Sequence, residues 1–331
     1  MDMNKFKTLQ IVNTPTFHST IIEQEKPILE DGEVFIKVEY SDVNYKDALA
    51  NSEAGGVIRS YPMTPGIDLA GVVVESQDKR YQLGDSVLAT GYGLGVSHPG
   101  GYSQYQKVPG DWIVPLPANL TSRQAMILGT AGFTAALCVN ALVEQGMNKT
   151  DKIVVSGATG GVGSVVIALL HQLGFTSIIA LTRKQQATDW LTDLGATEVV
   201  SPNAFLPEKT NPLAKQQINY LIDTVGGSQL AKLLPLISYN GAAALCGNAG
   251  GIKLETTVLP FILRNIQLIG IDSVNVPHAS RSRVWQQLAD WAITDTLRVK
   301  EISLEELPEI TQQLLAGTHQ GRTLVNVGGQ K

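Results

Sequence analysis

One stretch, residues 152–173, constrains the fold more than any other part of the chain. The β-branched run at 153–155 is typical of a buried strand, and a glycine-rich turn, residues 157–163, follows directly. Apolar residues at 165, 166, 169 and 170 then repeat as on one face of a helix. A turn without Cβ atoms lets the backbone approach a pyrophosphate, and a helix N-terminus attracts its charge. The alternative, a loop that serves only tight packing, is disfavoured by this strand–turn–helix context. The stretch therefore predicts a dinucleotide site contacted by Thr159, Gly160, Gly161, Val162 and Gly163.

The chain after residue 151 alternates strands and helices. Besides 153–155, we expect strands at 177–182, 198–200, 218–223, 242–246 and 266–271, with helices near 185–194 and 228–236. This alternation predicts a doubly wound parallel sheet of the Rossmann type, so the fold class is α/β. Ligands of such sheets bind outside the carboxyl ends of the strands, and Leu245 and Asn248 lie at and after the end of the fifth strand.

The chain before residue 117 has a different pattern. Short strands, expected at 34–40, 68–74, 86–89 and 102–108, are broken by Gly, Pro and Asp, which predicts a barrel-like β module. A helical stretch begins near residue 121 and continues past Gly129 to about 144. Near the end of the chain we expect helices at 281–293 and 304–315 and strands at 299–302 and 323–327, packed on the first module. At 331 residues, two domains are expected.

The end of the second strand after residue 151 indicates which coenzyme binds. Sites for NAD usually carry an acidic residue there, which binds the ribose 2′-hydroxyl. This chain has Thr182, Arg183 and Lys184 instead, with no acidic residue before Asp189. Two cations and a hydroxyl suit a 2′-phosphate, although a solvated basic pair that opens a helix is the alternative. The pattern predicts NADPH.

Composition excludes several other classes of protein. A net charge of −5 argues against nucleic acid as a partner, since phosphate contacts need a basic surface. No run approaches 18 consecutive apolar residues and the first ten residues lack an apolar signal core, so we expect no membrane partner and a soluble cytoplasmic protein. Cys138 and Cys246 lie far apart in apolar runs and are expected to be free buried thiols.

Several motifs carry a family likeness over essentially the whole chain. The segments PGIDLAGVV (65–73), LGDSVLATG (83–91), GGYSQYQKVP (100–109), TAGFTAALCV (130–139) and SGATGGVGS (156–164) resemble the medium-chain dehydrogenase/reductase superfamily. NYKDAL (44–49), DTVGG (223–227), CGNAGG (246–251), LPFILRN (259–265) and GIDSV (270–274) resemble its acryloyl-CoA reductase branch, which also carries the label quinone oxidoreductase. The resemblance implies a GroES-like β-barrel catalytic domain of residues 1–124 and 270–331. It also implies a Rossmann domain of residues 125–269 and a homodimer through the edge of the Rossmann sheet.

The chain departs from the zinc-dependent members of that superfamily. Those members use a Cys or His in the first catalytic loop, a GHE-type motif in the second and a four-cysteine lobe. This chain has Asn44, Tyr45 and Asp47 in the first loop, Asp68 in the second and no cysteine before Cys138. Because zinc needs three or four ligands in tetrahedral reach, we expect no metal site.

Without a metal, the resemblance implies reduction of an activated C=C bond. Hydride from NADPH would go to the β-carbon of acryloyl-CoA and a proton to the α-carbon, giving propanoyl-CoA. One alternative is an NADPH:quinone or enone reductase without a CoA requirement. The other is a protein that binds NADPH without catalysis.

The resemblance also suggests which residues act. Asn44 and Asp68 occupy the places of metal ligands, so Asn44 would donate to substrate or nicotinamide and Asp68 would orient Asn44 or a water, unless the pair only stabilises two loops. Tyr45 would lie beside the nicotinamide as a general acid or an aromatic wall. Ile271 and Ser273 would contact the nicotinamide amide or simply pack at a strand end.

The CoA phosphates call for cations at the rim of the site. Arg59, Arg264 and Arg281 are candidates because they resemble basic positions of the branch. A solvated surface role is the alternative for each of the three.

Overall fold

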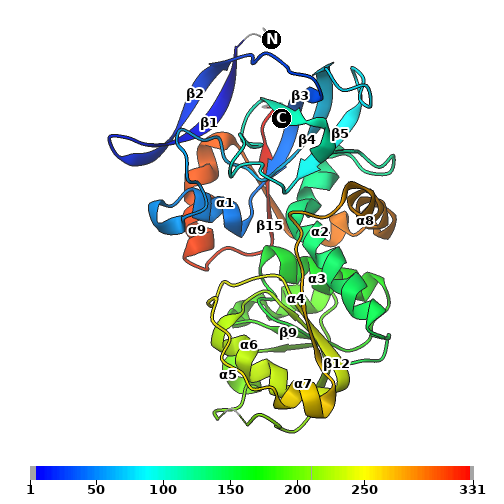
Figure 1. The fold of residues 1–331 in the computed structure, drawn as a ribbon. Coiled ribbons are helices and arrows are strands. Elements are labelled where there is room, and N and C mark those ends of the chain that lie inside the picture. Colours follow the sequence, from blue (N-terminus) through cyan, green and yellow to red (C-terminus); the bar gives the residue numbers. More distant parts are fainter. Residues whose placement is uncertain (1–4, 210, 329–331) are drawn as a thin grey trace. The chain divides into compact units, whose positions relative to one another are not determined.

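The computed structural model describes residues 5–209 and 211–328, which divide into two compact units (Figure 1). Unit 1 comprises Met1–Thr130, Val274–Asp290 and Arg298–Lys331, and unit 2 comprises Ala131–Ser273 and Trp291–Leu297. The main crossings between units fall between Thr130 and Ala131 and between Ser273 and Val274. The short return of 291–297 to unit 2 was not expected.

Unit 1 is built on a seven-stranded sheet, which gives the expected GroES-like β module. The order is β14-β15-β3-β4-β5-β7, and β6 also pairs with β3. The strands are β3 (Glu33–Asp42), β4 (Asp68–Ser76), β5 (Ser86–Thr90), β6 (Tyr105–Pro109), β7 (Ile113–Pro115), β14 (Val299–Ile302) and β15 (Arg322–Asn326). The central strand β3 alternates apolar Val34, Ile36 and Val38 into the core.

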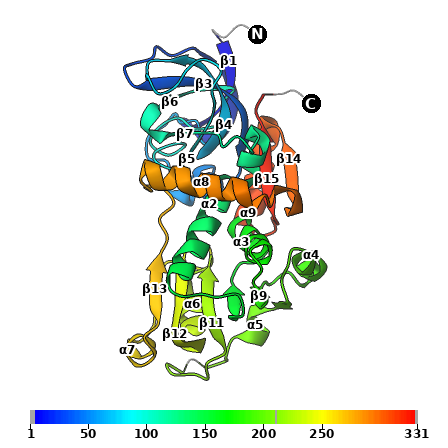
Figure 2. The same ribbon diagram turned by 90° about the vertical axis from the view of Figure 1, so that its right-hand side faces the viewer.

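The last part of the chain packs on this module, as expected. Strand β15 pairs antiparallel with β3, so Leu324 lies opposite Asp42. Helices α8 (His278–Trp291) and α9 (Leu307–Leu315) accompany it, with α8 lying beside the end of β5 (Figure 2). The hairpin of β1 (Lys5–Asn13) and β2 (Phe17–Glu25), strand β7 and the six-residue helix α1 (Tyr45–Ala50) were not foreseen.

Unit 2 contains the expected six-stranded parallel sheet, in the order β10-β9-β8-β11-β12-β13. Its strands are β8 (Ile153–Val155), β9 (Ile178–Leu181), β10 (Glu198–Val200), β11 (Ile218–Asp223), β12 (Ile237–Leu245) and β13 (Gln267–Gly270). Strand β12 begins earlier than the expected residue 242, because exposed Tyr239 and Asn240 hide its first half from an apolar pattern. The strand order reverses between β8 and β11, which is where such sheets bind ligands.

Helices complete unit 2: α3 (Gly161–Gln172), α4 (Thr188–Asp193), α5 (Pro202–Phe205), α6 (Gly227–Leu233) and α7 (Leu259–Arg264). The long helix α2 (Ser122–Glu144) is kinked at Gly129, whose φ of 52° and ψ of −156° are not helical. Among the residues described, α2 alone has the length and hydropathy of a membrane span. However, 72% of its most apolar window is buried inside the protein, as in a core helix.

Candidate active site

The glycine-rich turn of unit 2 lies between strand β8 and helix α3, with Gly160 as the N-cap. Gly157 has a φ of 60°, and a Cβ there would collide with Thr224 Oγ1. A Cβ on Gly163 would collide with the carbonyl oxygen of Gly157. The turn is therefore restricted to glycine at these positions for reasons of space, while the first-turn N–H groups of α3 are left for an anion.

A buried aspartate, which the sequence analysis did not identify as a site residue, holds this turn to the neighbouring strand. Asp223, at the end of β11, accepts a hydrogen bond from Ser156 Oγ at 2.6 Å and from the Gly226 N–H at 2.7 Å. Burial raises the pKa of its carboxyl, against the opposing effect of these bonds. Because Ser156 follows β8 directly, the contact joins the carboxyl ends of β8 and β11, the two strands at the switch point.

The end of β9 presents the predicted hydroxyl and cations. Thr182 is buried, Arg183 is exposed and Lys184 is half-buried. The Lys184 N–H donates to Thr182 Oγ1 at 3.0 Å, which holds the three residues in a tight turn. Burial, together with the neighbouring Arg183, lowers the pKa of Lys184. An anion at this position would relieve the repulsion between the two cations.

The remaining predicted coenzyme residues lie at the carboxyl ends of β12 and β13. The Ile271 N–H donates to the Leu245 carbonyl at 2.9 Å, so these two candidates are adjacent. Asn248 is exposed and Ser273 is partly exposed, which leaves both accessible to a ligand.

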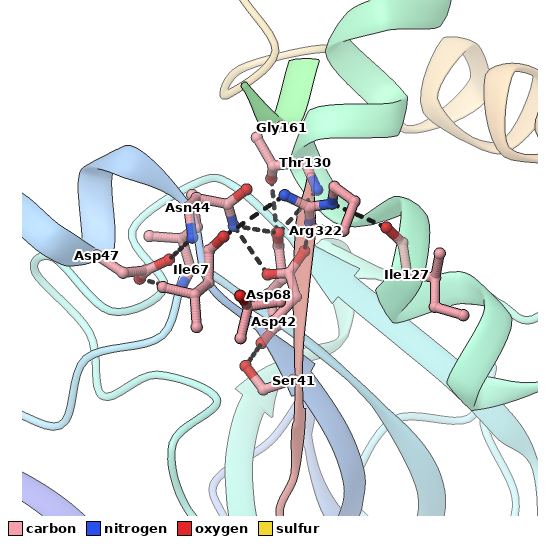
Figure 3. A network of polar contacts seen from close by, with 12 residues as sticks. Ser41, Asp42, Asn44, Asp47, Ile67, Asp68, Ile127, Thr130, Gly161 and Arg322 are labelled. Carbon is pink, nitrogen blue, oxygen red and sulfur yellow. Dashed lines mark hydrogen bonds and ion pairs between the residues drawn. The ribbon is translucent and has the colours of Figure 1, made fainter. Parts of the chain in front are cut away.

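In unit 1, a buried polar network surrounds Asn44 (Figure 3). The two hydrogens of its amide nitrogen point at two carboxylates, Asp42 Oδ1 and Asp68 Oδ2, each at 2.8 Å. With the amide turned over, its oxygen would face the two carboxylates and could donate to neither. The hydrogen-bond partners therefore assign the orientation of the Asn44 amide. The sequence analysis expected Asn44 to donate to a ligand, and here both donors are already used inside the protein.

Asp68 links this network to the kink of α2. Its carboxylate accepts bonds from the Thr130 N–H at 2.7 Å and from Thr130 Oγ1 at 2.6 Å, besides that from Asn44. The kink at Gly129 frees the Thr130 N–H from the helix and turns it toward Asp68 (Figure 3). The two loops that carry Asn44 and Asp68 are thus held to a helix end as well as to each other.

Asp42 and Arg322 form a fully buried ion pair, and neither was identified from sequence. The Arg322 guanidinium also donates from Nε to the Ile127 carbonyl at 2.9 Å. Burial, and then the nearby Asp68, raise the pKa of Asp42 well above its usual value despite Arg322. A Cβ on Gly129 would collide with Asp42 Oδ2, so this contact requires glycine.

A third buried carboxyl, Asp47, connects the two loops. Its oxygens accept the Asn44 N–H at 2.9 Å and the Ile67 N–H at 3.0 Å. Burial raises its pKa to about 7, while these two bonds act in the opposite direction. The first of these bonds belongs to a capping box at the start of α1, so the Asn-x-x-Asp spacing was a usable signal. Tyr45, the neighbouring candidate, is 39% exposed.

These carboxylates do not fit a zinc ion. Both oxygens of Asp68 accept bonds from Asn44 and Thr130, and Asp42 is paired with Arg322. Within residues 5–209 and 211–328, no three His, Cys, Asp or Glu side chains are grouped to hold a metal. Zinc would have to displace these N–H and O–H donors before the carboxylates could coordinate it.

Two of the three arginines proposed for CoA are not rim residues, which corrects that prediction. Arg264 is 8% exposed and donates to the Pro235 and Ala214 carbonyls, each at 2.6 Å. Arg281 is fully buried and donates to the Thr90 carbonyl at 2.9 Å. Only Arg59 is exposed. The guanidinium groups of Arg264 and Arg281 thus donate to backbone carbonyls in the interior, although the sequence suggested that they would be available to phosphate.

Comparison with protein families gives two matches. The alcohol dehydrogenase GroES-like domain matches residues 30–118, and the zinc-binding dehydrogenase matches residues 161–293. A protein of Escherichia coli (strain K12) named "Probable acrylyl-CoA reductase AcuI" is 47% identical over 90% of this chain and 92% of its own length. A protein of Bacillus subtilis (strain 168) named "Putative quinone oxidoreductase YhfP" is 45% identical over 93% of each chain.

Solved structures agree with this assignment of the fold. E. coli K-12 YhdH with bound NADPH superimposes with a TM-score of 0.92 at 43% identity, covering 97% of this chain and 99% of that one. Bacillus subtilis YhfP with NAD bound gives a TM-score of 0.93 at the same identity and coverage.

Proposed function

The chain belongs to the zinc-binding dehydrogenase family with a GroES-like domain, and from this we propose that it is an NADPH-dependent acrylyl-CoA reductase. The observation that carries the proposal is the 47% identity, over 90% of the chain, to the acrylyl-CoA reductase relative. In the proposed reaction hydride goes to the β-carbon of the acrylyl group and a proton to the α-carbon. The product is propanoyl-CoA.

The residues of unit 2 fit the coenzyme. The turn from Thr159 to Gly163 offers backbone N–H groups and the N-terminus of the twelve-residue helix α3 to a pyrophosphate. Arg183 and Lys184 supply the positive charge that a 2′-phosphate needs. When bound, reduced nicotinamide supplies the hydride. Leu245, Asn248, Ile271 and Ser273, at or just after the carboxyl ends of β12 and β13, would hold the nicotinamide.

The residues of unit 1 suit a reaction in which the substrate carries its own electron sink. A thioester carbonyl delocalises the electron pair that hydride addition leaves on the α-carbon, so the protein's task is to orient groups and supply fixed dipoles. Asp68 and Asp42 each accept a hydrogen bond from the Asn44 amide and so hold this side chain in one orientation. We assign Asn44 and Asp68 to orientation of the site and exposed Tyr45 to contact with the reacting groups.

The test is coenzyme oxidation with four acceptors in parallel: acryloyl-CoA, crotonyl-CoA, acrolein and a benzoquinone. We expect acryloyl-CoA to have the highest kcat/KM. A higher value for the benzoquinone would establish instead the second candidate, an NADPH:quinone reductase, which the 45% identity to YhfP favours. NADPH binding without turnover of any acceptor would point to a binding protein.

Arg59 is the remaining candidate for the CoA phosphates. Because it is exposed, replacing it by alanine should raise the KM for acryloyl-CoA and leave the KM for NADPH unchanged. Exposed Lys79 offers a matched control, since Lys79→Ala removes a surface cation elsewhere in unit 1. An unchanged KM in Arg59→Ala would remove Arg59 from the site.

We further propose a soluble cytoplasmic homodimer formed through an edge of the Rossmann sheet. In the described residues the edge strands of this sheet are β10 and β13, and exposed apolar side chains lie close to β13 in sequence: Ile252, Val258, Ile262 and Leu263. Free backbone groups beside an apolar patch form a surface suited to pairing with a second copy. Light scattering after gel filtration should give a dimer, and Leu263→Asp should give a monomer. A wild-type monomer would refute this proposal.

A further inference from the structure

The segment that leaves the carboxyl end of β13 has no regular structure of its own. Residues 271–277 lie between β13 and α8 and are neither helix nor strand. Within this segment the chain passes from unit 2 to unit 1, at Ser273 and Val274. Its conformation therefore depends on contacts made by its backbone with the rest of each unit.

In unit 1, Arg281 and Tyr92 both donate hydrogen bonds to this backbone. Arg281 donates from Nη2 to the Val274 carbonyl at 2.9 Å. Tyr92 donates from its N–H to the same carbonyl at 3.2 Å and from its hydroxyl to the Val276 carbonyl at 3.2 Å. Three donors on the carbonyls of Val274 and Val276, two residues apart, fix both the position and the direction of the segment.

Burying the Arg281 cation and holding Tyr92 at a positive φ both cost free energy, which argues that these two residues serve a function. Arg281 is 0% exposed, and a buried cation is unfavourable unless its donors are satisfied. Its guanidinium carbon lies 4.5 Å from the Tyr92 ring centroid, and Nη1 donates to the carbonyl and the hydroxyl of Thr90, both at 2.9 Å. Tyr92 itself has a φ of 51°, a conformation unfavourable for a bulky side chain.

Only a guanidinium can make this set of contacts. The planar guanidinium donates to Thr90, at the end of β5, and to Val274 at the same time, and its face stacks on the Tyr92 ring. The Tyr92 ring also stacks on the Trp112 ring, with 5.5 Å between the ring centroids and 6° between the ring planes. A lysine ammonium is a point charge and can neither span the two carbonyls in this way nor stack.

We propose that Arg281 and Tyr92 are positioning residues for the nicotinamide half of the coenzyme site. A dinucleotide lies across both halves of a doubly wound sheet, and the second half here is β11, β12 and β13. The Ile271 N–H is hydrogen-bonded to Leu245 at the end of β12. The hydrogen bonds from Arg281 and Tyr92 fix the other end of the same segment. The proposal rests on the proposed use of NADPH.

The test compares two ligands on wild type and on Arg281→Lys. NADPH occupies both halves of the site, whereas 2′,5′-ADP occupies only the half formed by β8, β9 and β10. We expect the Kd of NADPH to rise by about tenfold or more, equivalent to roughly 1.4 kcal/mol, and the Kd of 2′,5′-ADP to stay unchanged. If Arg281 served folding alone, Arg281→Lys would lower thermal stability and change the Kd of NADPH and that of 2′,5′-ADP by the same factor.

Each outcome is decisive. An unchanged Kd for NADPH, or an equal rise for both ligands, would overturn the role of Arg281. Failure of wild type to bind NADPH would instead overturn the proposed function. If Arg281→Lys does not fold, Tyr92→Phe decides, because it removes only the hydroxyl bond to Val276. It should raise the Kd of NADPH several-fold, the loss of about one hydrogen bond, and leave 2′,5′-ADP binding as in wild type.

Discussion

Replacing Asp47 by asparagine should change how stability depends on pH. Burial raises the pKa of this carboxyl from 3.8 to about 7. Between these values the native protein holds a proton that the unfolded chain has lost, so stability falls as the pH rises. The stabilisation is complete below about pH 4 and is lost as the pH rises through about 7. Three pKa units at about 1.4 kcal/mol each amount to about 4 kcal/mol.

The assay is urea unfolding of wild type and Asp47→Asn from pH 4 to pH 8. Asparagine does not titrate, so the wild-type free energy of unfolding minus that of the variant should fall by about 4 kcal/mol over this range. Asp189→Asn is the matched control, since Asp189 is exposed, and it should give a nearly constant difference. A difference for Asp47→Asn that is constant, or that grows with pH, would refute the assignment of a neutral buried carboxyl.

Three further predictions follow from the same geometry. Gly129→Ala should destabilise unit 1 by about 3 kcal/mol or more, because a strained φ combines with collision against a buried carboxylate. Gly56→Ala, also at positive φ but with open space around it, should cost only about 1–2 kcal/mol in the same urea titration. Arg322→Met should cost about 3–5 kcal/mol by removing the counter-charge of a buried carboxyl, and a smaller loss in calorimetry would contradict a buried pair. Lys184→Ala and Arg183→Ala should each weaken NADPH binding by about tenfold and leave NADH binding unchanged. A preference for NADPH over NADH that is unchanged from wild type in both variants would refute the 2′-phosphate site.

The Rossmann sheet was predictable because its signals are local. Each buried parallel strand is a short apolar run, and the glycine turn at 157–163 sits between one such run and a helix. Strand β12 shows the limit of this reasoning, since its first half carries exposed Tyr239 and Asn240. Helix α1 was missed because six residues are too few for a periodicity.

The polar network of unit 1 was only half predictable. Asn44 and Asp68 were identified through the resemblance of their loops, and Asp47 follows from capping-box spacing. Asp42 and Arg322 are 280 residues apart, so no local pattern connects them. Arg281 was misassigned because a sequence does not reveal whether a guanidinium meets solvent or a backbone carbonyl.

The pairing of β15 with β3 has a consequence for synthesis of the chain. Asp42 and its counter-charge on Arg322 are 280 residues apart, so Asp42 is synthesised long before its partner. Unit 1 is assembled from three separate stretches and so has many contacts of high sequence separation, whereas most of unit 2 is one continuous stretch. The nascent Rossmann-like unit can thus fold before strand β15, which unit 1 needs, has been synthesised.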